Sequence, residues 1–179
     1  MIIDGSDPLA AAMRTAALAL NSQQKRYSHQ RRIKRAAIQH SRAILPHLEG
    51  PISKCADFSS LFKLIKDELV DVTGIGELYV YDTALRIGAK LGVFPEKVYL
   101  HAGTRIGVRN LGLDARRTAL RMASLPRALR RLKPHEVEDK LCIFKDRFGA
   151  TVHGVRRSWC DDARTKCEIL PVRARTACG

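Results

Sequence analysis

Apolar side chains recur every three or four positions through most of residues 8–148, and this spacing is typical of amphipathic helices. The stretch DFSSLFKLIKDELVDV places its large apolar residues mostly on one face, with Asp57 or Ser59 available as the N-cap. A second helix is expected after the glycine turn VTGIG and ends before Gly92, a natural C′ residue. Its apolar positions lie three or four apart: Leu78, Tyr81, Leu85, Gly88 and Leu91. The pattern therefore predicts two helices joined by a tight turn.

Two basic helices are predicted before this pair, over Pro8–Asn21 and Gln24–Leu45, because helix-favouring residues dominate there. No Asp or Glu occurs from Pro8 to Leu48, a stretch that contains Arg14, Lys25, Arg26, Arg31, Arg32, Lys34, Arg35 and Arg42. The apolar stripe of the second helix is narrow. Its cationic faces either lie on a phosphate backbone or are solvated.

More helix is predicted after the central pair, interrupted by glycine and proline. The stretch FPEKVYL is a short connector, and HAGTRIGVRNLG predicts a helix closed by Gly112. Within that helix, Gly103 and Gly107 allow the close approach of a neighbouring segment. Asp114 is a candidate cap for a helix over DARRTALRMASL, and the last helical pieces are expected in RALRRL and KPHEVEDKLCIFKDRFG.

Charge indicates the kind of partner. The 179 residues carry a net charge of +14 and have a pI of about 10.1, which favours a polyanion such as nucleic acid. The alanine-rich N-terminal run is preceded by MIIDGSD, which lacks the positive charge of a signal peptide. That run is also too short to span a bilayer. Five cysteines, an odd number, fit a reducing compartment, so we expect a cytoplasmic protein with no membrane partner.

The glycine turn has a chemical use as well as a packing one. Gly74 and Gly76 can adopt backbone angles closed to residues with a Cβ, and Ile75 is expected to plug between the two helices. The first amides of the second helix are then unpaired and lie at the positive end of its dipole. Such an end binds phosphate without reading base edges. The predicted contacts are Thr73, Gly74, Ile75, Gly76 and Glu77.

The motif VTGIG followed by an amphipathic helix resembles the hairpin of helix-hairpin-helix DNA-binding proteins. The wider span from Asp57 to Leu113 resembles the corresponding part of the helix-hairpin-helix DNA glycosylase superfamily, about a third of the chain. There the hairpin is followed by a connector and a helix ending in a basic residue near LGL. VYLHAGTRIGVRNLGL has that layout. The resemblance implies a helical fold that binds DNA.

The catalytic groups that the resemblance implies are missing. Superfamily members carry an Asp at the start of the helix after the connector, a place taken here by Leu100, His101 or Ala102. Bifunctional members add a nucleophilic Lys beyond the hairpin, where this chain has Glu77, Leu78 and Tyr79. His101 is either a general base or a structural histidine, and no spaced carboxylate or cysteine partner is recognisable. We therefore expect no glycosylase or strand-cleaving activity and assign no catalytic residue.

Arginines after the hairpin extend the predicted phosphate contacts. Arg105 and Arg109 lie four apart on one expected helix, and Arg116, Arg117 and Arg121 lie on the next. In the C-terminal region His153, Cys160, Cys167 and Cys178 have metal-ligand chemistry, but their spacing matches no compact zinc pattern. No metal or cofactor is therefore predicted.

The predicted fold is all-α: a single helical domain with a central helix-hairpin-helix and a loosely ordered basic C-terminal tail. Its expected divisions are basic N-terminal helices over 1–50, the helix-hairpin-helix core over 51–148 and the tail over 149–179. The predicted function is DNA binding through backbone phosphates, largely independent of sequence. One alternative is a divergent DNA glycosylase or lyase that uses His101 or Asp82 for repair. The other is a protein-interaction module whose basic surface meets an acidic partner.

Overall fold

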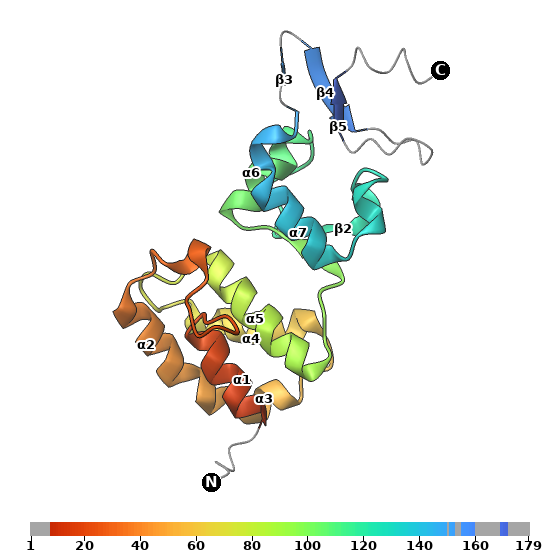
Figure 1. The fold of residues 1–179 in the computed structure, drawn as a ribbon. Coiled ribbons are helices and arrows are strands. Elements are labelled where there is room, and N and C mark those ends of the chain that lie inside the picture. The colour runs from red at the N-terminus through yellow and green to blue at the C-terminus, as the bar shows by residue number, and fades with distance from the viewer. Residues whose placement is uncertain (1–7, 150, 153–154, 160–168, 172–179) are drawn as a thin grey trace. The chain divides into compact units, whose positions relative to one another are not determined.

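A computed structural model describes residues 8–149, 151–152, 155–159 and 169–171. The described chain is mostly helical (Figure 1), as the pattern predicts, and it contains short strands as well. It divides into two compact units, Met1–Pro95 and Glu96–Gly179, so the expectation of a single domain is wrong. The division falls inside the predicted 51–148 core, because the buried residues from Val98 to Phe148 form a cluster of their own.

The first unit is helical and is built around one long helix. Its α-helices are α1 (Pro8–Ala17), α2 (Arg35–Ile44), α3 (Glu49–Ser53), α4 (Phe58–Leu69) and α5 (Glu77–Leu91), with 3₁₀ turns η1 (Ser28–Gln30) and η2 (Leu45–Leu48). Helix α5 packs against both α1 and α4. Its buried residues occupy more than one face, as expected for a helix with neighbours on two sides. Helix α5 is therefore the central helix of the first unit, against which α1 and α4 pack.

The predicted central helix pair is confirmed in its bounds and caps. The side chain of Asp57 accepts a hydrogen bond from the backbone N–H of Ser60 at 2.8 Å, which caps α4. Gly92 follows α5 in the left-handed conformation with φ of +74°. These local signals lie close in sequence to the helix ends that they define.

The helix predicted over Gln24–Leu45 is wrong in its first half. The chain turns after α1, where the Asn21 side chain accepts hydrogen bonds from the N–H groups of Gln23 and Lys25 at 2.9 and 3.0 Å. An asparagine that bonds to nearby backbone in this way favours a turn over a helix. Helix α2 begins only at Arg35, and the segment before it is an irregular loop with one 3₁₀ turn.

One tyrosine links three helices of this unit. Tyr79 of α5 is buried, and its hydroxyl donates to the carbonyl oxygen of Ala17 at the end of α1 at 2.6 Å. The Tyr79 hydroxyl oxygen also lies 2.8 Å from the Ser41 hydroxyl oxygen of α2, within hydrogen-bonding distance. The last carbonyls of a helix lack intrahelical partners, so this hydroxyl satisfies one of them. Tyr79 thereby positions the start of α5 against α1 and α2.

The second unit combines two helices with a two-stranded antiparallel ribbon. Its elements are β1 (Lys97–Tyr99), α6 (Ala102–Asn110), β2 (Ala119–Arg121), α7 (Pro134–Ile143) and the 3₁₀ turns η3 (Met122–Ser124), η4 (Leu129–Arg131) and η5 (Lys145–Arg147). Strands β1 and β2 pair in the register Lys97↔Arg121, Val98↔Leu120 and Tyr99↔Ala119. Val98 and Leu120 are buried in the cluster of this unit.

The helix predicted over DARRTALRMASL is absent, and residues 119–121 form β2 instead. Asp114 does bond to nearby backbone, but it accepts from the N–H of Arg116 at 3.1 Å and so closes a turn. Leu120 faces the core only when the chain is extended beside β1, because side chains alternate along a strand. Tertiary burial therefore overrides the local helix preference.

The close approach predicted at Gly103 and Gly107 is confirmed. A Cβ on Gly107 would lie under 3.0 Å from the backbone carbonyl oxygen of Leu141. A Cβ on Gly103 would lie 2.6 Å from the Cys142 sulfur. Both neighbours belong to α7, so the absence of a side chain at Gly103 and Gly107 lets α6 and α7 approach closely.

Beyond Gly149 the structure describes three short strands, β3 (Thr151–Val152), β4 (Val155–Trp159) and β5 (Ile169–Pro171), which pair in that antiparallel order. The expectation of a loosely ordered tail did not include these strands, and the rest of the predicted tail lies outside the described residues. Among the residues with a described placement, no helix combines the length and hydropathy needed to cross a bilayer.

Candidate nucleic-acid interface

The two glycines of the turn differ in conformation. Gly74 has φ of +91°, a region that favours glycine, and a Cβ there would lie 3.6 Å from the Cβ of Ala37. Gly76 is the N-cap of α5, with φ of −115° and ψ of 172°, and a Cβ there would meet nothing within 4 Å. The expectation of unusual backbone angles at both positions is therefore correct for Gly74 and wrong for Gly76.

The N-terminus of α5 has no side-chain cap. Gly76 offers no side chain to cap the helix, and the backbone N–H groups of the first turn lie at the positive end of its dipole. Thr73, Gly74, Gly76 and Glu77 are exposed, as a phosphate contact requires. Ile75 is only half-buried, so the buried apolar residue of the turn is Val72 at 3% exposure.

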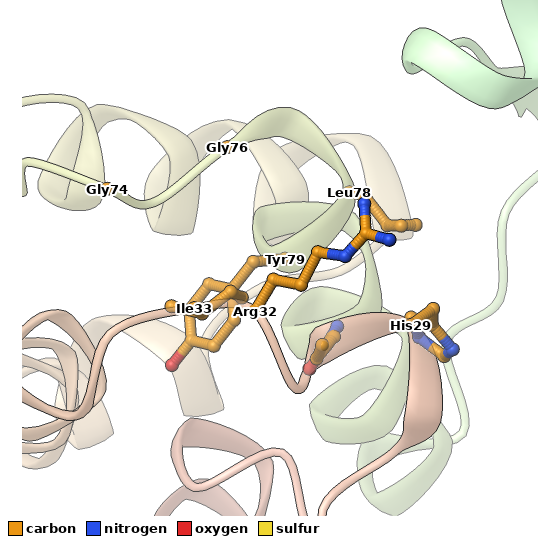
Figure 2. Close-up of a pocket in the computed structure, with 8 residues that line it drawn as sticks. His29, Arg32, Ile33, Gly74, Gly76, Leu78 and Tyr79 are labelled. Carbon is orange, nitrogen blue, oxygen red and sulfur yellow. The ribbon is translucent and has the colours of Figure 1, made fainter.

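A hollow of about 330 Å³ adjoins the glycine turn (Figure 2). One side consists of Gly74, Gly76, Leu78 and Tyr79, and the loop before α2 supplies the other, with His29, Gln30, Arg32 and Ile33. Figure 2 shows the Arg32 side chain extending from this loop across the hollow in the direction of Leu78. The structure thus brings a cationic segment beside the predicted phosphate site.

Asp82 holds that segment against α5. Its Oδ2 lies 2.7 Å from His29 Nε2, accepts a hydrogen bond from the Gln30 side-chain amide and lies 3.3 Å from Arg86 NH2. Arg86 in turn lies over the ring of Tyr27, with its guanidinium carbon 4.3 Å from the ring centroid. The Asp82 carboxylate therefore has a structural role: its contacts hold the loop that forms one wall of the hollow.

The five predicted arginines lie in the second unit, whereas the turn residues lie in the first. Arg109 and Arg121 are exposed and Arg105 is half-buried. Arg116 and Arg117 lie 3.3 and 3.4 Å from the Asp114 carboxylate. The pKa of that carboxyl is lowered, chiefly by the hydrogen bond from the backbone N–H of Arg116. These two guanidiniums are thus partly neutralised by an ionised neighbour.

Like charges face each other on the ribbon of the second unit. Lys97 and Arg121 are directly opposite in the β1–β2 register, and both are exposed. Such a pair is unfavourable between neighbouring strands unless an anion or solvent screens it. The structure therefore identifies Lys97 as a further candidate phosphate contact, beside the predicted Arg121.

The expectation that His101 lacks a carboxylate partner is wrong. Its Nε2 is hydrogen-bonded to Oε1 of Glu138 from α7, and the two side chains are only 3% and 5% exposed. His101 also precedes α6 in a reciprocal capping box with Thr104, whose hydroxyl accepts from the His101 backbone N–H at 2.7 Å. His101 is buried, hydrogen-bonded to Glu138 and placed at the N-cap of α6, an arrangement that stabilises the fold.

The residues that the sequence interpretation missed are His29, Gln30, Arg32 and Ile33 in the loop before α2. Asn21 and Ser28 were the available signals, since both types favour turns and caps over helix interiors. Within the described ranges, no three His, Cys, Asp or Glu side chains converge to hold a metal ion. His153, Cys160, Cys167 and Cys178 lie outside the described residues.

No protein-family model, curated protein or solved structure matches this chain.

Proposed function

We propose that this protein binds DNA through backbone phosphates, largely independently of sequence. The N-terminus of α5 at the glycine turn, which has no side-chain cap, carries the proposal. Its backbone N–H groups, at the positive end of the helix dipole, and the adjacent Arg32 offer a phosphate both directed donors and a positive charge. No base edge takes part in such contacts, so they discriminate little between sequences.

The second unit supports the same function with separate cations. Arg109, Arg121 and Lys97 are exposed, and a phosphate between the last two would relieve their mutual repulsion. We propose that these residues, with Arg105, Arg116 and Arg117, bind further DNA phosphates. The net charge of +14 is consistent with a polyanionic partner.

A glycosylase or lyase is the less supported alternative. The groups that would have to act, His101 and Asp82, are each engaged with protein partners, and His101 is buried. Neither offers a free carboxylate or amine at the glycine turn. We therefore propose binding without base excision.

Duplex binding measured by fluorescence anisotropy at several salt concentrations tests the function. If about six phosphates are contacted, the affinity should fall by about three orders of magnitude over a roughly fourfold rise in salt. Duplexes of unrelated sequence should bind within about threefold of one another. Absence of duplex binding would overturn the proposal. Binding of an acidic protein, together with no affinity for duplex at any salt concentration, would support the interaction module.

A further inference from the structure

The loop before α2 is held in place by contacts within the first unit. The Asp82 carboxylate of α5 accepts a hydrogen bond from the Gln30 side-chain amide and lies 2.7 Å from His29 Nε2. Arg26 closes the loop on itself, because its NH1 donates to the carbonyl oxygen of Ile33 at 3.1 Å. The residues that follow these anchors are therefore presented by a backbone that is already fixed.

The cations beside these anchors are exposed, and we call them the basic surface: Arg31, Arg32, Lys34, Arg35 and Arg42. In the part of the chain that the structure describes, none of them has a carboxylate within ion-pair distance. Lys34 is the N-cap of α2 and Arg35 its first residue, and no acidic residue occupies the first turn. Cations at this positive end of the helix dipole are unfavourable. A bound polyanion would relieve their repulsion.

The exposed side of α2 continues this surface. Arg35, Gln39 and Arg42 follow one another at spacings of four and three, so they lie on one side of the helix. Ala36 and Ala43 are exposed as well, and side chains of this size let a large surface approach the helix. From Arg35 to Arg42 the helix rises by about 10 Å, a length that corresponds to about three phosphates of one strand along a duplex axis.

We infer that the basic surface lies along the phosphate backbone of a DNA duplex, an inference that rests on the proposed function. Only Arg32 is shared with the contact proposed at the glycine turn. Asp82 touches no DNA and is a positioning residue, because its contacts hold the loop that carries the first cations. Since this loop is ordered before binding, less conformational entropy is lost when phosphates bind. A protein partner would anchor on large apolar or aromatic side chains, and the exposed residues of α2 include none.

The first comparison removes two cations of the basic surface by combining Arg35→Gln with Arg42→Gln. Loss of two phosphate contacts should lower duplex affinity by at least about tenfold at about 0.1 M salt and reduce the salt slope by about two. The control combines Lys66→Gln with Lys90→Gln, which removes the same charge from exposed positions on α4 and α5. This control should bind duplex within about threefold of the parent and keep the salt slope.

The second comparison uses the sign of the effect at Asp82. Asp82→Ala removes a negative charge, so charge alone predicts tighter binding of duplex. If Asp82 positions the loop, affinity should instead fall by at least about threefold. Asp67→Ala removes an exposed carboxylate from α4 and should bind as tightly as the parent or more tightly. A purely stabilising role at Asp82 would lower the melting temperature without weakening binding by the folded protein, and circular dichroism establishes that each variant is folded.

The outcomes separate this surface from the proposed function. If the parent binds duplex and the Arg35, Arg42 double variant binds it equally well, the basic surface is not a DNA contact, whereas phosphate binding elsewhere stands. If the double variant loses affinity only for poly-glutamate, the surface belongs to an acidic protein partner and the inference is wrong. Tighter duplex binding by Asp82→Ala would overturn the positioning role. If the parent binds no duplex, the proposed function fails, and the inference fails with it.

Discussion

The Tyr79 hydroxyl holds α1, α2 and α5 together at the end where the proposed site lies. Replacing it in Tyr79→Phe leaves the Ala17 carbonyl and the Ser41 hydroxyl without this partner, while the ring still fills its place. We expect the free energy of unfolding to fall by about 1–3 kcal/mol, the usual cost of an unsatisfied buried group. Urea denaturation followed by circular dichroism measures this loss, and an unchanged midpoint would contradict it.

The same residue predicts an alkaline limit to stability. Burial raises the pKa of Tyr79 above its ordinary value of about 10, although the hydrogen bond to Ser41 partly opposes this. A raised pKa in the folded state means that the contribution of Tyr79 is complete below about pH 10 and is lost as the pH rises through the raised value. Tyr79→Phe should be less sensitive to pH in this range than the parent. If the parent and Tyr79→Phe lose stability equally as the pH rises, groups other than Tyr79 cause the loss.

Among residues, the predictable features were those with local causes. Asp57 and Gly92 end their helices through contacts within a few positions, so sequence patterns identified them. Gln30 and Asp82 meet across 52 positions, and no local pattern encodes that contact. The loop before α2 therefore went unrecognised as part of the candidate site.

The crossing of α6 and α7 depends on a helix surface without a side chain at Gly107. Gly107→Ala introduces a carbon under 3.0 Å from the Leu141 carbonyl oxygen, which is backbone and cannot rotate away. We expect a loss of about 1–3 kcal/mol, confined to the second unit. In scanning calorimetry the transition of that unit should move to lower temperature. The first unit should unfold as in the parent, and a shift of both transitions together would contradict the division of the chain.

In the β1–β2 ribbon, one change of charge at Lys97 should raise stability and weaken DNA binding. Lys97→Glu replaces a repulsive cross-strand pair by an attractive one with Arg121, so the second unit should gain about 0.2–1 kcal/mol. The same change should weaken DNA binding and lower the salt slope by about one or two. Lys97→Gln is the control, with an intermediate effect on both quantities. If Lys97→Glu is more stable but binds DNA with unchanged affinity, the ribbon is not part of the DNA-binding surface.

Among elements, long helices with a clear apolar period were predicted and short strands were not. Helices α4 and α5 follow their patterns closely. Strand β2 has only three residues within a helix-favouring sequence, and it exists because Leu120 is buried beside β1. A partner 22 positions away decides that conformation, as the Val98↔Leu120 pairing shows.

At the scale of the whole molecule, the net charge indicates a class of partner, whereas only the structure shows how the candidate contact residues are divided between units. The net charge of +14 favours a polyanionic partner wherever the cations lie. The division at Pro95 falls in FPEKVYL, which the sequence predicts as a short connector inside one domain and not as a boundary between two units. The turn residues and the five arginines were predicted as one interface, and the structure describes them in separate units.

The most direct test of the central claim is the affinity of Gly76→Ala, Gly76→Asn and Gly76→Asp for intact duplex. A Cβ at this position would meet nothing within 4 Å, and the backbone there suits any residue. Alanine leaves the α5 amides open, asparagine occupies them without charge, and aspartate occupies them with a negative charge. We predict that Gly76→Ala binds within about threefold of the parent, that Gly76→Asn binds more weakly, and that Gly76→Asp loses at least about tenfold. Equal affinity of Gly76→Asp, Gly76→Asn and the parent would show that no phosphate is bound at this helix.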